Sequence, residues 1–156
     1  MAFREIERKF LVAGDFHSEV SGANHIVQGF LSSVPGRTVR VRLRDGKGCL
    51  TVKGPARGLT RFEWEKEIPG EEAELLLRLC EPGVIDKTRH LVPAPDGHVW
   101  EVDEFHGDNE GLVVAELELE AEDESFERPT WLGGEVTGDR RYYNTALSKC
   151  PYKDWK

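Results

Sequence analysis

Regular alternation of apolar and charged residues dominates the stretch RTVRVRLRDGKGCLTVKG, which runs from Arg37 to Gly54. Alternate residues of a β-strand point to opposite faces of the sheet, so such a strand has one apolar and one charged face. Asp45-Gly46-Lys47-Gly48 interrupts the pattern with residues typical of a hairpin turn. The stretch therefore predicts two antiparallel strands. In the first strand, the apolar positions are Val39, Val41 and Leu43, and the basic positions are Arg40, Arg42 and Arg44.

The same pattern recurs along most of the chain. Further strands are expected over about residues 4–12, 25–32, 59–68, 84–92, 98–105 and 112–121, and helices over 71–79 and 140–148, with Asp139 as a cap. About eight strands suit a closed barrel, because closure removes the unpaired sheet edges. We therefore expect a mainly β (α+β) fold, an eight-stranded antiparallel closed barrel with a few flanking helices. Residues 1–156 are expected to form a single domain.

The charges are grouped by sign, strand by strand. A solvated face usually mixes its signs, because like charges in neighbouring positions repel each other. Here whole rows share one sign, which costs stability unless opposite charges lie over them. We infer that the charged faces line a central tunnel and that the apolar faces point outward. Residues at strand ends, Arg44, Glu67 and Glu120, are expected to be solvated. The acidic rows are Glu63, Glu65 and Glu67, then Glu101 and Asp103, then Glu116, Glu118 and Glu120, and the basic pair is Lys87 and Arg89.

The first strand contains the segment EIERKF, in which Glu5, Glu7 and Lys9 alternate with Ile6 and Phe10. A wet outer face would explain this strand if it were alone, because exposed charges need no partner. The grouped charges on the other strands favour the tunnel instead.

A polyanion bound with a divalent metal ion fits such a tunnel. Arginine forks and lysine ammonium groups hold phosphates, and Mg²⁺ or Mn²⁺ accepts carboxylate and phosphate oxygens together. A metal ion therefore lets glutamates and phosphates share one cavity, and it can activate water. Lys9 would suit a base or water-positioning role, or it would be one more phosphate contact.

Bulk properties exclude several other functions. The net charge of −8 disfavours nucleic acid and anionic membranes as partners. There is no apolar run near 18 residues and no signal-peptide pattern at the N-terminus. Three widely spaced cysteines are typical of reduced thiols, so a cytoplasmic location is expected. The five histidines have no HExxH spacing, which disfavours a zinc hydrolase.

In order along the chain, the motifs are EIERKF, RVRLR, LTVKG, RFEWEKEI, KTRH, EVDEFHG, VAELELE and DRRYYN. EIERKF resembles the ExExK signature of the CYTH domain, the triphosphate tunnel metalloenzymes, and the ordered set resembles that family from Glu5 to about Asn144. The resemblance is to the short, single-domain prokaryotic members, and it implies an eight-stranded barrel around a charged tunnel.

The resemblance also implies roles for individual residues. Matched to the family pattern, the metal ligands are Glu5, Glu7, Glu116 and Glu118, the phosphate-binding residues are Lys9, Arg40, Arg42, Lys53, Lys87, Arg89 and Arg141, and the further acidic tunnel residues are Glu63 and Glu65. Lys9 is in addition the candidate catalytic residue.

The family resemblance implies a divalent-metal-dependent triphosphatase, with inorganic tripolyphosphate as the simplest substrate. A class IV-type adenylyl cyclase and a thiamine or nucleoside triphosphatase remain as alternatives. A non-catalytic polyphosphate-binding module is the alternative of another class, which the acidic rows disfavour because anion binding needs no glutamates. The chain is expected to be a monomer or a homodimer.

Overall fold

The computed structural model describes residues 2–4, 6–57 and 60–155. The described strands are β1 (Ala2–Arg4), β2 (Ile6–Val12), β3 (Gly22–Val34), β4 (Arg37–Arg44), β5 (Lys47–Arg57), β6 (Thr60–Ile68), β7 (Ile85–Pro93), β8 (Val99–Phe105), β9 (Val113–Leu119) and β10 (Leu132–Glu135). The helices are α1 (Gly70–Leu77) and α2 (Asn144–Lys149), with short 3-10 helices η1 (His17–Glu19), η2 (Gly107–Asn109), η3 (Arg140–Tyr142) and η4 (Tyr152–Asp154).

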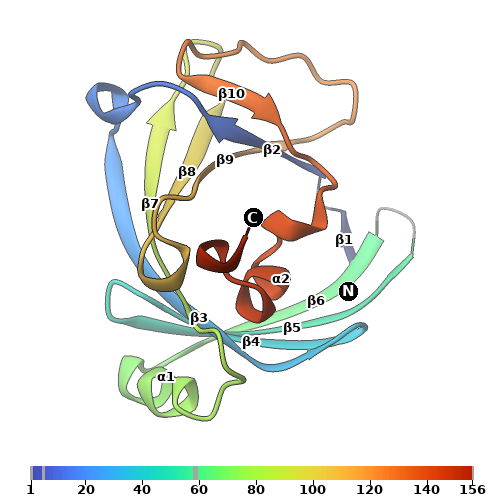
Figure 1. Ribbon diagram of the computed structural model, residues 1–156. Coiled ribbons are helices and arrows are strands. Elements are labelled where there is room, and N and C mark those ends of the chain that lie inside the picture. The colour runs from blue at the N-terminus through green and yellow to red at the C-terminus, as the bar shows by residue number, and fades with distance from the viewer. Residues whose placement is uncertain (1, 5, 58–59, 156) are drawn as a thin grey trace.

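All ten strands belong to one antiparallel sheet, in the order β1-β6-β5-β4-β3-β7-β8-β9-β2-β10. This confirms the prediction of a mainly β fold with a few helices. The sheet curls around the C-terminal segment (Figure 1).

The ends of this sheet differ from the predicted closed barrel. The single strand expected over residues 4–12 is divided: β1 pairs with β6, whereas β2 pairs with β9. The N-terminal segment thus contributes a strand near each end of the sheet: β1 is one end strand, and β2 lies next to β10, the other end strand. Among the described residues, no strand ladder joins the end strands β1 and β10, so hydrogen bonds do not complete the ring there. The count rises from the expected eight strands because of this division and because of β10, whose glycine-rich sequence has no alternation.

The β4–β5 hairpin confirms the turn read from the sequence. Asp45 and Gly46 both have positive φ, 49° and 83°, as a tight two-residue hairpin turn of type I′ requires. Gly48 follows on β5, where a Cβ would lie 2.8 Å from the Cβ of Ala73 in α1. The missing side chain therefore lets α1 pack closely on the outside of the hairpin.

The main apolar core lies on the outer side of the sheet. Phe10, Trp100 and Leu117 are buried there beneath Trp131 and Phe126, which come from the segment between β9 and β10. In Figure 1 this segment passes outside β2 and β9. The apolar faces of these strands therefore pack outward, as the alternation predicted, and the opposite face is left for charged residues.

The C-terminal segment occupies the inside of the curled sheet (Figure 1). Tyr142 and Leu147 pack there against Phe105 and Val114 and form a second buried cluster. The helix expected over 140–148 is divided into η3 and α2. The expected cap is present, because the Asp139 side chain accepts a hydrogen bond from the backbone N–H of Arg141 at the start of η3. This segment covers one end of the inner face of the sheet.

Within the described residues, neither α-helix has the length and apolar character needed to cross a bilayer.

Candidate active site

The strand register places the predicted charged residues on one face of the sheet. Directly paired residues of neighbouring antiparallel strands point to the same side. The pairs that connect the face are Glu7–Glu118, Lys9–Glu116, Glu101–Glu116, Arg89–Asp103, Lys87–Ile26, Gln28–Arg42, Arg40–Thr51, Thr51–Glu65 and Lys53–Glu63. We call this side, which faces the C-terminal segment, the inner face.

Asp103 on β8 is the centre of a buried ionic network. Its carboxylate accepts a hydrogen bond from Lys87 Nζ at 2.7 Å, and a fork of two from Arg89 Nε and Nη2 at 2.8 and 2.9 Å. Lys87 is 0% exposed and Asp103 is 1% exposed. Both cations come from β7 and occupy alternate positions of its inner face.

Burial and charge act in opposite directions on the pKa values of this network. Burial by itself would raise the pKa of Asp103, but the charges of Lys87 and Arg89 outweigh it and hold that pKa at about 2. Burial likewise opposes the charge on Arg89, yet its hydrogen bonds to Asp103 raise the pKa of the guanidinium. Burial lowers the pKa of Lys87, against the attraction of Asp103. The Asp103 carboxylate is therefore the group that compensates both buried cations of this network.

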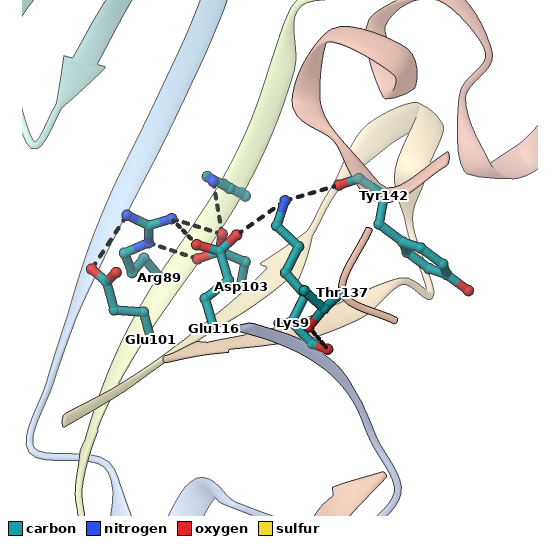
Figure 2. A network of polar contacts seen from close by, with 8 residues as sticks. Lys9, Arg89, Glu101, Asp103, Glu116, Thr137 and Tyr142 are labelled. Carbon is teal, nitrogen blue, oxygen red and sulfur yellow. Dashed lines mark hydrogen bonds and ion pairs between the residues drawn. The ribbon is translucent and has the colours of Figure 1, made fainter. Parts of the chain in front are cut away.

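Glu116 connects this network to Lys9 on β2 (Figure 2). Its carboxylate lies 3.8 Å from Arg89 Nη2 and 3.7 Å from Lys9 Nζ. The Lys9 ammonium also lies 3.5 Å from the carbonyl oxygen of Tyr142 and 5.0 Å from the ring centre of Tyr143. The Lys9 side chain therefore lies between β9 and the C-terminal segment, in contact with a carboxylate, a carbonyl oxygen and an aromatic ring.

The arginine row on β4, together with Gln28 beside it, is only partly satisfied by hydrogen bonds. Arg42 Nε donates to the side-chain oxygen of Gln28 at 3.0 Å, and Arg40 Nη2 donates to Thr51 Oγ1 at 3.3 Å. Among the residues that the structure describes, the buried donors Gln28 Nε2 and Arg40 Nε have no hydrogen-bond partner. Such groups are costly to bury unless a ligand or water satisfies them. Arg44, at the end of the row, is exposed as expected.

Burial lowers the pKa of the two inner arginines of this row, Arg40 and Arg42. For Arg42 the pKa falls to about 10, first because of burial and then because of the neighbouring positive charges of Arg40 and Arg89. For Arg40 burial again lowers the pKa, against the attraction of Glu65 and Glu63. A bound polyanion would relieve this repulsion between cations.

Carboxylates gather at the seam formed by β2 and β9. Glu7 and Glu118 are direct cross-strand partners, and Glu116 is the next inner-face residue along β9. Glu5, the fourth expected ligand, lies outside the described residues. This donor set consists of oxygen atoms alone, which suits a hard cation such as Mg²⁺ or Mn²⁺. The residues present therefore fit a divalent metal ion.

The comparison with known proteins supports the same interpretation. The family model of the CYTH domain matches residues 4–149. The chain belongs to the CYTH family. An inorganic triphosphatase of Acetivibrio thermocellus is 49% identical over 154 residues, covering 98% of both chains. An inorganic triphosphatase of Nitrosomonas europaea is 38% identical over 152 residues, covering 92% of this chain and 96% of that protein.

A solved structure has the same fold. The crystal structure of the inorganic triphosphatase NE1496 matches with a TM-score of 0.74 and 35% identity, covering 94% of this chain and 95% of that one. Membership of the CYTH family, together with the carboxylate set, implies a divalent metal ion as cofactor.

Arg141 is the one described CYTH-pattern residue that no strand pairing places on the inner face, because it belongs to η3. Its guanidinium pairs with Asp139, with Nη2 at 3.0 Å from Oδ2, and packs 5.0 Å from the ring centre of Trp155. Its side chain is 62% exposed. The aspartate that caps η3 therefore also holds the guanidinium at the surface.

Three residues of this CYTH site were not assigned by the sequence motifs. Asp103 lies two residues after Glu101 in EVDEF, so alternation places both on the charged face. Alternation does not reveal that Asp103 binds both β7 cations. Gln28 and Thr51 have no charge, so the grouping of charges could not mark them. Thr51 Oγ1 lies 3.3 Å from Glu65, which links the acidic row of β6 to Arg40.

Proposed function

We propose that this protein is a divalent-metal-dependent triphosphatase that hydrolyses inorganic tripolyphosphate to pyrophosphate and phosphate. The observation that carries the proposal is one continuous face. Among the described residues it has a guanidinium donor of Arg40 on β4 and an amide donor of Gln28 on β3 without partners, and it has carboxylates on β2 and β9. A linear triphosphate is a rod of negative charge that needs cations along its length and a metal ion at one end. The names of the two relatives, both inorganic triphosphatases, support the same substrate.

In this proposal the basic residues of the inner face have different roles. Arg40 and Arg42, with Lys53 beside them on β5, bind phosphate oxygens of the substrate. Arg89 is held by Asp103, which also binds Lys87, so the positive charge of Arg89 is fixed in place on the inner face. Glu63 and Glu65 keep the arginine row oriented from β6.

The reacting phosphoryl group is assigned to the seam between β2 and β9. Glu7, Glu116 and Glu118 would hold Mg²⁺ or Mn²⁺, together with Glu5. Such an ion polarises a phosphoryl group and lowers the pKa of bound water. Lys9 lies next to Glu116, so we assign its ammonium to the same phosphoryl group, where it positions the attacking water or stabilises developing charge.

A cytoplasmic location and a monomeric or homodimeric state are part of the proposal. Cys49, Cys80 and Cys150 are free thiols, as a reducing compartment would leave them. A small triphosphate substrate requires no second chain.

Removal of the metal ion should abolish phosphate release from tripolyphosphate. The carboxylates at the seam would otherwise repel the substrate, so no slower metal-free route is expected. Phosphate release is measured with Mg²⁺, with Mn²⁺ and with EDTA, on tripolyphosphate, ATP and thiamine triphosphate. Full activity in EDTA would refute the metal dependence, and preference for ATP would favour a nucleotide enzyme. Tight tripolyphosphate binding without turnover would favour a binding module.

Substitution of the two inner arginines should separate substrate binding from surface charge. Arg40→Ala and Arg42→Ala should each lower kcat/KM about ten- to a hundredfold, because a charge-assisted contact is worth about 1.5–3 kcal/mol. The matched control, Arg44→Ala, removes the same charge from the exposed end of the row and should have much less effect. Equal losses at all three positions in steady-state kinetics would contradict the assigned roles.

A further inference from the structure

The outer side of the sheet carries a group of metal-binding side chains far from the charged residues of the inner face. One ligand atom each of His17, His90 and Glu104 lies within 4.8 Å of the other two. His90 is on β7 and Glu104 on β8, at positions that alternate with the inner-face residues Arg89 and Asp103. The three side chains therefore belong to no part of the triphosphate site.

One distance in this group is close to that of a metal centre. A four-coordinate ion with ligands at about 2.0–2.2 Å holds neighbouring ligand atoms roughly 3.3 Å apart. His90 Nε2 and Glu104 Oε1 are already 3.0 Å apart. The third side chain, His17, is 60% exposed, and its ligand atom lies within 4.8 Å of both.

Asp15 orients the His17 ring. Its Oδ1 accepts a hydrogen bond from the His17 backbone N–H at 2.9 Å and lies 2.7 Å from His17 Nδ1. A proton held on Nδ1 by a carboxylate leaves Nε2 of the neutral ring with its lone pair for a metal. This carboxylate–histidine arrangement is the one that commonly supports metal-ligating histidines.

Phe16 fixes the loop that carries His17. Its side chain is only 3% exposed and packs in the outer core against Trp131. The same ring stacks on His17, with centroids 4.3 Å apart, and meets His90 edge-on at 5.2 Å. The two imidazoles are therefore positioned by a buried anchor between β2 and β3, and their convergence does not depend on the flexible ends of long side chains.

We propose that His17, His90 and Glu104 bind a zinc-class divalent ion. Two imidazoles and one carboxylate suit Zn²⁺ or Co²⁺, whereas the all-oxygen set of the inner face suits Mg²⁺ or Mn²⁺. The exposure of His17 leaves room for water as a fourth ligand. Such an ion would link the β2–β3 loop to strands β7 and β8 on the outside of the sheet.

The test is calorimetric titration of the full chain with Zn²⁺ in excess Mg²⁺, which keeps the inner carboxylates occupied. Wild type should bind Zn²⁺ at this site, and His17→Ala or Glu104→Gln should weaken that binding tenfold or more. His17→Ala is the primary variant because an exposed side chain can be removed without loss of fold. If Zn²⁺ fills two sites, the proposed one is the site lost in His17→Ala.

Two matched variants and a second signal make the result specific. His25→Ala removes another exposed histidine that is paired with one carboxylate, Asp86, and should leave the affinity unchanged. Glu118→Gln should also leave it unchanged, because that residue belongs to the inner face. Co²⁺ bound at the outer site should give a visible spectrum with imidazole ligation that disappears in His17→Ala. Zinc binding that survives His17→Ala and Glu104→Gln, or that is lost only in Glu118→Gln, would overturn the proposal.

Discussion

Glu118→Gln should abolish most tripolyphosphate hydrolysis while leaving the metal-free protein at least as stable as wild type. Glu118 is exposed on β9, directly opposite Glu7 on β2. Without metal, the two paired carboxylates repel each other, so removal of one charge relieves this repulsion and can stabilise the fold. With metal, the variant lacks one ligand, so the stabilisation that binding gives to the folded state should shrink.

Thermal melting of both proteins in EDTA and in excess Mn²⁺, together with kcat/KM, measures this difference. Glu120→Gln is the matched control, because it makes the same chemical change just beyond the end of β9, where the side chain is exposed. It should retain activity and the full metal-induced increase in melting temperature. If Glu118→Gln melts well below wild type in EDTA, Glu118 has a structural role and the metal-ligand assignment loses its support.

Asp103→Asn should cause the largest loss of stability of any single change in the site. The substitution leaves Lys87 and Arg89 buried without the carboxylate that neutralises them. Breaking a buried ionic network by removal of one partner costs about 3–5 kcal/mol. Urea denaturation of wild type and variant measures this loss. The control is Glu101→Gln, which removes a more exposed carboxylate from the same arginine and should cost less than about 1 kcal/mol.

The pH dependence of stability gives the Asp103 prediction a second readout. The pKa of Asp103 is lowered in the folded protein to about 2, below the value of an unfolded aspartate. The carboxylate therefore contributes stability that is fully present above the unfolded pKa and is lost as the pH falls towards 2. The variant should lack this part of the acid-induced loss. Parallel acid denaturation curves for the two proteins would show that Asp103 does not carry the network.

The sequence alone determined most of the strands, the hairpin and the two-sided character of the sheet. Alternation with a period of two is a local property, so each strand can be assigned a charged and an apolar face without knowledge of its neighbours. Arg40 and Arg42 were assigned to a charged inner row in this way, and Gly46 to a tight turn. The grouping of charges by sign also indicated a polyanion with a metal ion. A row of arginines needs an anion over it, and a row of glutamates needs a cation over it.

Tertiary structure decided which strands meet and what each charge contacts. Alternation fixes the face of Asp103 but not its neighbour, so only the β7–β8 register shows that it holds Lys87 and Arg89. Likewise, no local pattern divides the first strand between two partners or places the C-terminal segment inside the sheet. Arg141 has the sequence position of a phosphate ligand. In the structure its guanidinium pairs at the surface with Asp139, the residue that caps η3. The physical reason is the same in each case. Strand pairing, helix docking and buried ion pairs join residues far apart in the chain, and local periodicity cannot identify those partners.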